Sequence, residues 1–174
     1  MQVSVFVGIS VDGFIARRNG SFDFLDEGGG EPHGYTEFFA SVDALVIGRK
    51  TFEVVLAFPE WPYGDKLVIV LSSGKLDLSG VRGGRVEQMS GAPGEIVAKL
   101  EARGLKHVYL DGGITIQRFL REGCVDHLTI TRVPVLIGDG IPLFGTVPRD
   151  IKLRHISTQA YASGMVKTEY EIAR

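Results

Sequence analysis

Three short segments of this sequence combine glycine, hydroxyl and basic residues in patterns suited to holding phosphate groups. They are Gly48-Arg49-Lys50-Thr51, Ser72-Ser73-Gly74-Lys75 and Asp111-Gly112-Gly113-Ile114-Thr115. Glycine lets a backbone approach a ligand closely, and amides, hydroxyls and cationic side chains donate hydrogen bonds to phosphate oxygens. Taken alone, the first and third segments are equally compatible with a helix entrance bearing solvated basic residues or a tight turn, and the second is more simply a plain turn. Their combination favours a nucleotide site over coincidence.

The elements around these segments would bring them to one edge of a sheet. Each segment follows a short apolar run with the composition of a buried strand, at 44–47, 66–71 and 107–110. The first and third lead into stretches with helical spacing of apolar residues, at 49–56 and 114–121. A helix N-terminus offers unpaired N–H groups and a partial positive charge to a phosphate. Because open α/β sheets bind ligands at the carboxyl ends of their strands, we expect one shared site there.

The rest of the chain predicts an α/β fold with seven or eight strands and four helices. Further strands are expected at 3–9, 85–87 and 128–133, helices at 35–41 and 93–103, and a closing antiparallel hairpin at 151–160 and 165–172. Alternating strands and helices imply a largely parallel sheet covered on both faces, and the hairpin makes that sheet mixed. With no repeat or linker in the sequence, we expect residues 1–174 to form a single domain.

Composition narrows the class of protein. A net charge of −2 without a basic stripe argues against nucleic acid or an anionic membrane as the main partner. The lone Cys124 excludes an intrachain disulfide and a cysteine metal cluster, and the four histidines show no metal-ligand spacing. The apolar run at 3–9 has no basic leader before it, so we expect a cytoplasmic protein.

Taken in order, the motifs resemble the dihydrofolate-reductase-like superfamily, and within it the reductase domain of riboflavin biosynthesis and its stand-alone relatives. The resemblance rests on SVDGFIA at 10–16, IGRKTFE at 47–53, VLSS at 70–73, VYLDGG at 108–113 and the stretch 125–144 containing PVLIGDGIPLF. It implies a three-layer α/β/α fold with a mixed, mostly parallel sheet of about eight strands and a C-terminal antiparallel hairpin. It also implies NADPH as cofactor and a homodimer.

The resemblance further assigns a set of positions to the cofactor. They are Gly48, Arg49, Lys50 and Thr51 for the pyrophosphate or 2′-phosphate; Ser72 and Ser73 for the adenosine end; Gly112, Gly113, Ile114 and Thr115 for the diphosphate; and Gly8 and Ile15 for the nicotinamide. In the family, the glycine pair at 112–113 can be joined by a cis peptide bond.

The substrate half of the site is less well marked in the sequence. Folate reductases place an acid on the helix before the Gly-Arg strand, and here Asp23, Glu31 and Glu37 are the candidates for that acid. For relaying a proton we name Asp12, Asp23 or Glu37. For Asp23, Glu31 and Glu37 a solvated surface position is the simpler interpretation.

The main hypothesis is hydride transfer from NADPH to a small polar heterocycle or ribosyl-imine, as in 5-amino-6-(5-phosphoribosylamino)uracil reductase. One alternative is a non-catalytic nucleotide-binding or regulatory module on the same fold, and another is a dihydrofolate or pteridine reductase. A deaminase or metal hydrolase is disfavoured because the sequence lacks clustered metal ligands.

Overall fold

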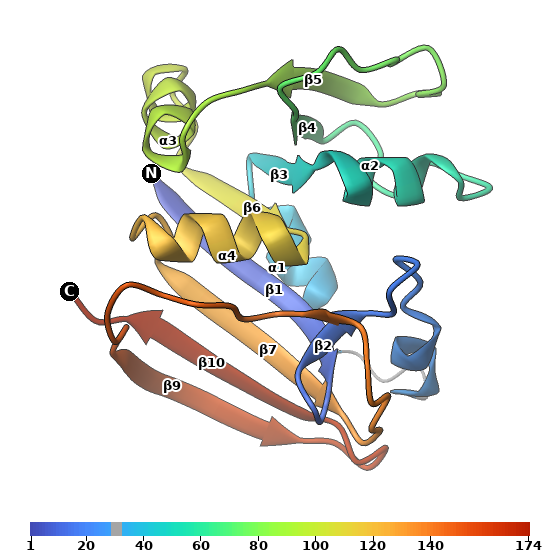
Figure 1. The fold of residues 1–174 in the computed structure, drawn as a ribbon, viewed down its shortest axis with the longest axis vertical. Coiled ribbons are helices and arrows are strands. Elements are labelled where there is room, and N and C mark those ends of the chain that lie inside the picture. The colour runs from blue at the N-terminus through green and yellow to red at the C-terminus, as the bar shows by residue number, and fades with distance from the viewer. Residues whose placement is uncertain (29–32) are drawn as a thin grey trace.

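Eight strands form one mixed sheet in the computed structural model, which describes residues 1–28 and 33–174 (Figure 1). In spatial order they are β5 (Arg85–Met89), β4 (Leu67–Leu71), β3 (Ala44–Gly48), β6 (His107–Asp111), β1 (Gln2–Ser10), β7 (His127–Val133), β10 (Val166–Ile172) and β9 (Leu153–Ala160). The strands from β5 to β7 are parallel, and β10 and β9 add the closing antiparallel hairpin.

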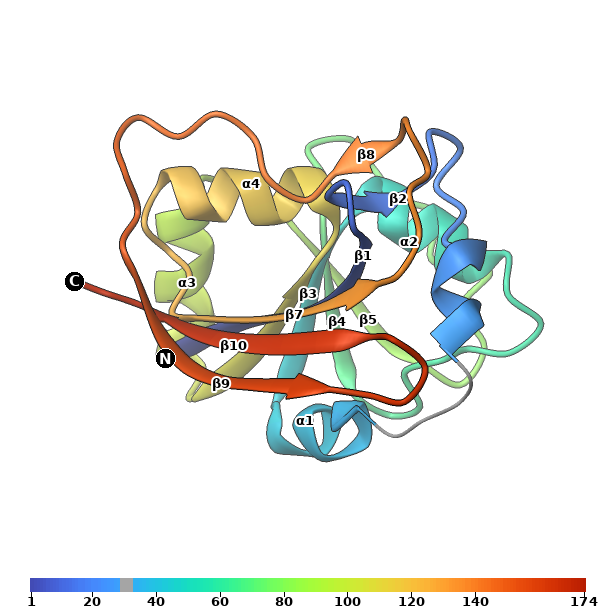
Figure 2. The ribbon, with the colours of Figure 1, turned by 90° about the horizontal axis from the view of Figure 1, so that it is seen from below.

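Helices cover both faces of this sheet. On one face lie α3 (Pro93–Ala102) and α4 (Gly113–Arg121), and on the other α1 (Tyr35–Ser41) and α2 (Arg49–Leu56). Figure 2 shows α4 and α1 on opposite sides of the strands. A 3₁₀ helix, η1 (Asp23–Gly28), contacts β1 and β7, and a separate two-stranded sheet joins β2 (Phe14–Ala16) to β8 (Ile141–Pro142).

Strand periodicity divides the core in two. The side chains of Val3, Val5, Val7 and Ile9 alternate along β1 onto the face covered by α3 and α4, where all four are buried. On the other face a second cluster gathers under α1 and α2; its buried members include Leu45, Ile47, Phe52, Val55 and Tyr109. Full burial of each large apolar side chain contributes about 1.5–3 kcal/mol, so the sheet holds its carboxyl edge rigidly.

The expected strands, helices and hairpin are confirmed, with ends that agree within one or two residues. Neither η1 nor the short β2–β8 pair was expected. η1 lies in a glycine- and acid-rich stretch and β8 in one rich in glycine and proline, and both compositions are typical of loops, while β2 is only three residues long. Across the described residues, no helix has the length and apolar character needed to cross a membrane.

Candidate active site

Two helices begin side by side at the carboxyl edge of the sheet. α2 follows β3 through Gly48 and α4 follows β6 through Gly112, and β3 and β6 are neighbouring strands. Since glycine has no side chain, neither residue caps the first N–H groups of its helix. Both helix N-termini therefore present amides and a partial positive charge to the same region.

The two turns interlock so closely that side chains are excluded. A Cβ on Gly48 would lie 2.6 Å from the hydroxyl of Thr115, and a Cβ on Gly112 would lie 2.7 Å from the hydroxyl of Thr51. Gly112 also has a φ of +100°, a conformation that costs other residues free energy. The first and third sequence motifs thus meet as one backbone cradle. Every peptide bond among the described residues is trans, so the Gly112–Gly113 linkage differs from the cis bond that the resemblance allows.

The second motif lies beside the first. A guanidinium nitrogen of Arg49 is 3.4 Å from where a Cβ on Gly74 would stand, so the side chain lies against the turn after β4. Within that turn the Ser72 hydroxyl donates to the carbonyl oxygen of Gly74 at 2.8 Å, while Ser73 is exposed. Arg49 also pairs with Glu53 at 2.8 Å on the exposed face of α2, and its neighbour Lys50 is exposed.

Gln88 on β5 holds this turn in place, and no motif or spacing in the sequence predicts that role. Its side-chain amide donates to the carbonyl oxygens of Ser72 and Gly74, and its oxygen accepts from the backbone N–H of Leu76. Three bonds from one side chain fix the loop that faces Arg49.

The residues expected near the nicotinamide lie at the other side of the cradle. Gly8 on β1 is covered by Leu25 of η1, whose methyl carbon lies 2.9 Å from where a Cβ would stand. Ile15 of β2 lies 3.2 Å from the corresponding point on Gly113. Ile114 in the first turn of α4 is 56% exposed, whereas Thr115 is buried and faces Gly48.

The three acids proposed to relay a proton lie apart from one another. Asp12 is exposed, and a hydrogen bond from Ser10, with further bonds from the backbone N–H groups of Gly138 and Ile137, lowers its pKa. Asp23 is bound by Arg17, which lowers its pKa as well. Glu37 is exposed in the first turn of α1, and Glu31 lies outside the described residues.

Asp111, at the carboxyl end of β6, has a carboxyl group whose pKa is raised. It is partly buried, and burial raises the pKa of its carboxyl to about 6, although the N–H of Gly112 donates to it at 2.7 Å. Its negative charge adds to the effect of burial in raising the pKa of the Tyr35 hydroxyl to about 12. The sequence marks Asp111 only as the first residue of a turn. Its neighbourhood arises from several elements, so spacing along the chain could not reveal it.

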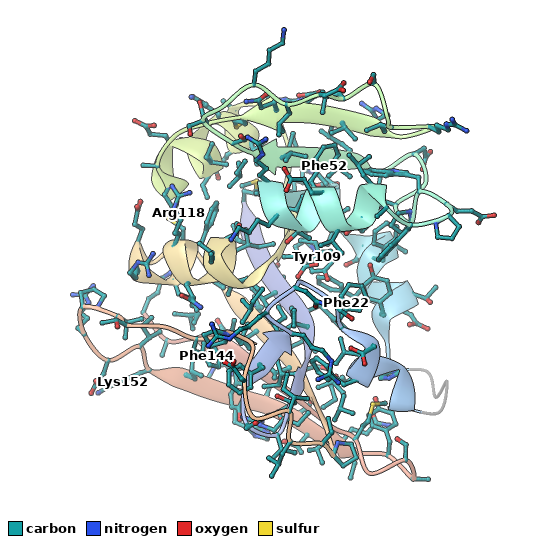
Figure 3. The ribbon with its side chains drawn as sticks, turned by 45° about the vertical axis from the view of Figure 1, so that its right-hand side comes forward. Phe22, Phe52, Tyr109, Arg118, Phe144 and Lys152 are labelled. Atoms are coloured by element: carbon teal, nitrogen blue, oxygen red, sulfur yellow. The ribbon has the colours of Figure 1, made fainter. Side chains whose placement is uncertain are left out.

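Aromatic rings surround Asp111 on the face of the sheet that carries α1 and α2. The hydroxyl of Tyr109 donates to the backbone oxygen of Phe6 at 2.9 Å, and the ring of Tyr35 lies 5.6 Å from that of Phe6. Tyr35 is 41% exposed while Tyr109 is buried. In the view of Figure 3, Tyr109 and Phe22 lie between α2 and η1. A planar ring entering here would meet both an acid and aromatic faces.

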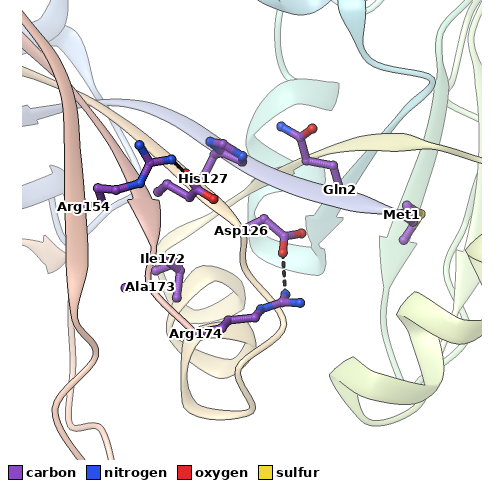
Figure 4. A pocket seen from close by; sticks show the side chains of 9 residues that line it. Met1, Gln2, Asp126, His127, Arg154, Ile172, Ala173 and Arg174 are labelled. Carbon is purple, nitrogen blue, oxygen red and sulfur yellow. Dashed lines mark hydrogen bonds and ion pairs between the residues drawn. The ribbon is translucent and has the colours of Figure 1, made fainter.

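Two cavities lie elsewhere on the molecule. One, of about 630 Å³, is lined by Gln2 and His127 at the amino ends of β1 and β7, where Asp126 pairs with Arg174 (Figure 4). The other, of about 350 Å³, lies between α4 and the segment 144–153 and is mainly apolar. Neither includes the glycine cradle. No group of three His, Cys, Asp or Glu side chains within 1–28 and 33–174 is placed to hold a metal ion.

The chain shares its fold with dihydrofolate reductase, as its strand order and closing hairpin indicate. The sequence profile of the RibD C-terminal domain matches residues 1–167, and the chain belongs to that family. It is 31% identical to the uncharacterized protein YwjB of Bacillus subtilis strain 168 over 164 residues, 92% of each chain.

Solved structures agree with this placement. A putative riboflavin biosynthesis protein from Shewanella sp. PV-4 superposes with a TM-score of 0.92 at 36% identity, over 100% of both chains. Dihydrofolate reductase from Enterococcus faecalis, in complex with NADP(H) and RAB-propyl, superposes with a TM-score of 0.68 at 16% identity, over 99% of this chain and 97% of that one. At that identity the second likeness concerns the fold alone.

Proposed function

We propose that this protein is an NADPH-dependent reductase of the riboflavin-pathway type, acting on a small polar heterocycle or ribosyl-imine. The observation that carries the proposal is the glycine cradle at the N-termini of α2 and α4. There Gly48 faces the hydroxyl of Thr115, and Gly112 faces the hydroxyl of Thr51. Two helix N-termini whose first amides have no side-chain cap, with threonine hydroxyls beside them, are suited to a diphosphate at this edge of the sheet. Membership of the RibD C-terminal domain family supports the same reaction class.

The cofactor roles follow from the positions of the side chains. Thr51, Thr115 and the amides of the cradle would hold the diphosphate. Arg49, lying against the Ser72–Gly74 turn, would bind the 2′-phosphate, with Lys50 and Ser73 exposed nearby. Gly8 and Ile15 would border the nicotinamide, and Ile114 would cover the diphosphate from the first turn of α4. When bound there, NADPH supplies a hydride to an electrophilic carbon.

Asp111 is our candidate for the proton donor, in preference to Asp12, Asp23 or Glu37. Reduction of a C=N bond adds a hydride to carbon and leaves the π electron pair on nitrogen, which must take up a proton. With a pKa of about 6, Asp111 is partly protonated near neutrality, whereas the pKa values of Asp12 and Asp23 lie below the ordinary value. Solvent would return the proton to Asp111 after each turnover.

A titration of the purified protein with NADPH and, separately, NADH tests the cofactor assignment. We expect NADPH-selective binding, and R49A should weaken NADPH by about 1–3 kcal/mol while changing NADH little. E53Q is the matched control, because it breaks the same ion pair and leaves the guanidinium in place. Equal loss for both cofactors in R49A would show that Arg49 does not read the 2′-phosphate, and no binding of either would refute the reductase. NADPH binding without turnover on pyrimidine and pteridine panels would instead indicate a regulatory module.

We further propose that the protein acts in the cytoplasm as a homodimer. The lone Cys124 is consistent with a reducing compartment. β9 supports the dimer, since it ends the sheet order and all eight of its residues are exposed. An unpaired strand edge of this kind is a template for pairing with a second copy.

A further inference from the structure

The helix α1 begins at a glycine that cannot cap it. Gly34 is the N-cap residue, and it adopts a left-handed conformation with a φ of +85° and has no side chain to offer the first N–H groups. α1 has only seven residues, and helices this short depend on tertiary contacts for their stability and position. The start of α1 therefore has to be fixed by another element.

That contact comes from Lys167 on β10, 134 residues along the chain from His33. Its ammonium donates to the backbone oxygen of His33 at 3.1 Å and lies 3.3 Å from where a Cβ on Gly34 would stand. Only 13% of the side chain is exposed, and the ammonium lies 3.4 Å from a carboxylate oxygen of Glu169. The partly buried lysine thus holds the corner at residues 33–34 against the sheet.

Helix stability alone does not explain an ammonium at this place. The N-terminus of a helix carries a partial positive charge, so a cation beside it is unfavourable for the helix. Partial burial of the ammonium of Lys167 adds a desolvation cost. What the contact does fix is the position of the residue that follows the corner, which is Tyr35.

The ring of Tyr35 forms one wall of the aromatic space around Asp111. It meets the ring of Phe6 edge-on with the centroids 5.6 Å apart, and its centroid is 6.2 Å from that of Tyr109. Burial, with the charge of Asp111 added to it, raises the pKa values of the Tyr35, Tyr63 and Tyr109 hydroxyls, so all three face the same carboxyl. Tyr35 is 41% exposed and the other two are buried, so Tyr35 is the outermost of the three.

We propose that Lys167 is a positioning residue, which anchors the corner at Gly34 and thereby holds the Tyr35 ring beside Asp111 and keeps water from that carboxyl. This role rests on the proposed reductase function, in which Asp111 donates the proton. The contacts run from β10 through the start of α1 to the carboxyl end of β6. Lys167 acts only through Tyr35.

Titration of the Asp111 carboxyl by carbon NMR tests this role in the cofactor-free protein. K167M keeps most of the apolar stem and removes the ammonium, so the corner is released and water reaches Asp111. We expect the pKa of Asp111 to fall from about 6 by about one unit, toward the ordinary value of 3.8. Loss of a positive charge would by itself raise that pKa, so a decrease identifies a change in burial.

Two further readouts follow the same contacts. The N–H of Phe38 donates to the backbone oxygen of Gly34 at 3.0 Å, and hydrogen exchange at this amide should accelerate in K167M. Because turnover requires protonated Asp111, the rate at pH 8 should fall about tenfold, while NADPH affinity stays unchanged. K167R retains a donor for His33 and should restore the wild-type pH profile.

Y35A and the double variant K167M/Y35A test whether the effect passes through the ring. Y35A should lower the pKa of Asp111 with Lys167 intact, so it decides the question even if K167M does not fold. The double variant should show no larger shift than Y35A. K152M makes the same substitution at an exposed lysine before β9 and should leave Asp111 unchanged.

Three results would overturn the proposal: an unchanged or raised pKa of Asp111 in K167M, additive shifts in the double variant, or a wild-type titration in Y35A. The NMR titration needs neither cofactor nor turnover. Failure of the reductase function therefore shows separately, as absence of NADPH binding by the wild-type protein.

Discussion

At the scale of the residue, the raised pKa of Asp111 lowers the stability of the fold at neutral pH and also suits the carboxyl to donate a proton. Its folded pKa of about 6 lies above the ordinary value of 3.8 because burial disfavours the charged form. The fold therefore favours the protonated state. The penalty for ionising Asp111 is absent well below pH 3.8 and complete above pH 6. Groups with such perturbed pKa values cluster at functional sites.

Replacing this carboxyl by an amide should stabilise the protein and abolish turnover. We expect D111N to raise the free energy of unfolding by about 1–3 kcal/mol at pH 8, because each pKa unit corresponds to about 1.4 kcal/mol. The asparagine oxygen can still accept from the N–H of Gly112. The gain should shrink as the pH falls from 6 to 4, and urea unfolding at several pH values measures it.

Asp43 provides a control, because its pKa is shifted in the opposite direction. Backbone N–H groups of His107 and Lys106 donate to its carboxylate and lower its pKa, so its contribution is present above the ordinary carboxyl pKa and is lost as the pH falls through the lowered value. D43N should therefore destabilise the protein at pH 8. A D111N protein that is less stable than wild type at pH 8, with normal turnover, would contradict the role assigned to Asp111.

The fit between Gly48 and Thr115 makes a second prediction at this scale. A Cβ at position 48 would meet the Thr115 hydroxyl at 2.6 Å, while the next atom of Thr115 lies 3.9 Å away. We expect G48A to destabilise the protein by about 1–3 kcal/mol through overpacking and to weaken NADPH binding. Adding T115A removes the only close atom, so the double variant should recover most of the lost stability, as a double-mutant cycle would show. Additive losses would mean that the two turns do not interlock.

At the scale of the element, the sequence predicts the strands, helices and turns, because these depend on the local pattern of apolar residues and glycines. Short apolar runs such as 44–47 and 67–71, each followed by glycine or serine, favour buried strands, and the glycines at 48 and 112–113 mark the turns after β3 and β6. The site groups that escaped prediction depend on tertiary neighbours. The pKa of Asp111 depends on burial under elements distant in sequence, and Gln88 reaches a turn 14 to 16 residues away.

The β4–β5 turn makes this dependence testable. Each of the three hydrogen bonds of Gln88 contributes about 1 kcal/mol net, and Gln88 is exposed, so Q88L should cost about 1–2 kcal/mol. Hydrogen exchange at the amide of Leu76 should accelerate, and NADPH affinity should fall because the turn facing Arg49 loosens. Q88E keeps the acceptor for Leu76 but cannot donate to the carbonyl oxygens of Ser72 and Gly74. It should preserve protection at Leu76 while losing affinity, and unchanged exchange in Q88L would show that the turn is held by other contacts.

At the scale of the whole molecule, the two ends of the sheet differ. The proposed cofactor site lies at the carboxyl edge of β4, β3 and β6, in the half of the sheet that ends in β5, whereas the β9 end presents eight exposed residues. Leu153 and Ile156 on β9 are 42% and 46% exposed, and both are apolar. A strand of this length extends about 26 Å, enough for the central part of a standard interface of about 800 Å² per partner. A two-fold axis along this edge would leave both cofactor sites open to solvent.

Sedimentation of I156K tests this arrangement. In a two-fold interface each copy contributes its own Ile156, so burying two lysines should raise the dimer dissociation constant by about 100-fold or more. Because the side chain is already exposed in the single chain, the unfolding temperature of the monomer should change little. T36K, at an exposed position on α1, adds the same charge away from β9 and should leave the dimer intact. A wild-type protein that sediments as a monomer, or an I156K dimer as tight as wild type, would move the interface away from β9.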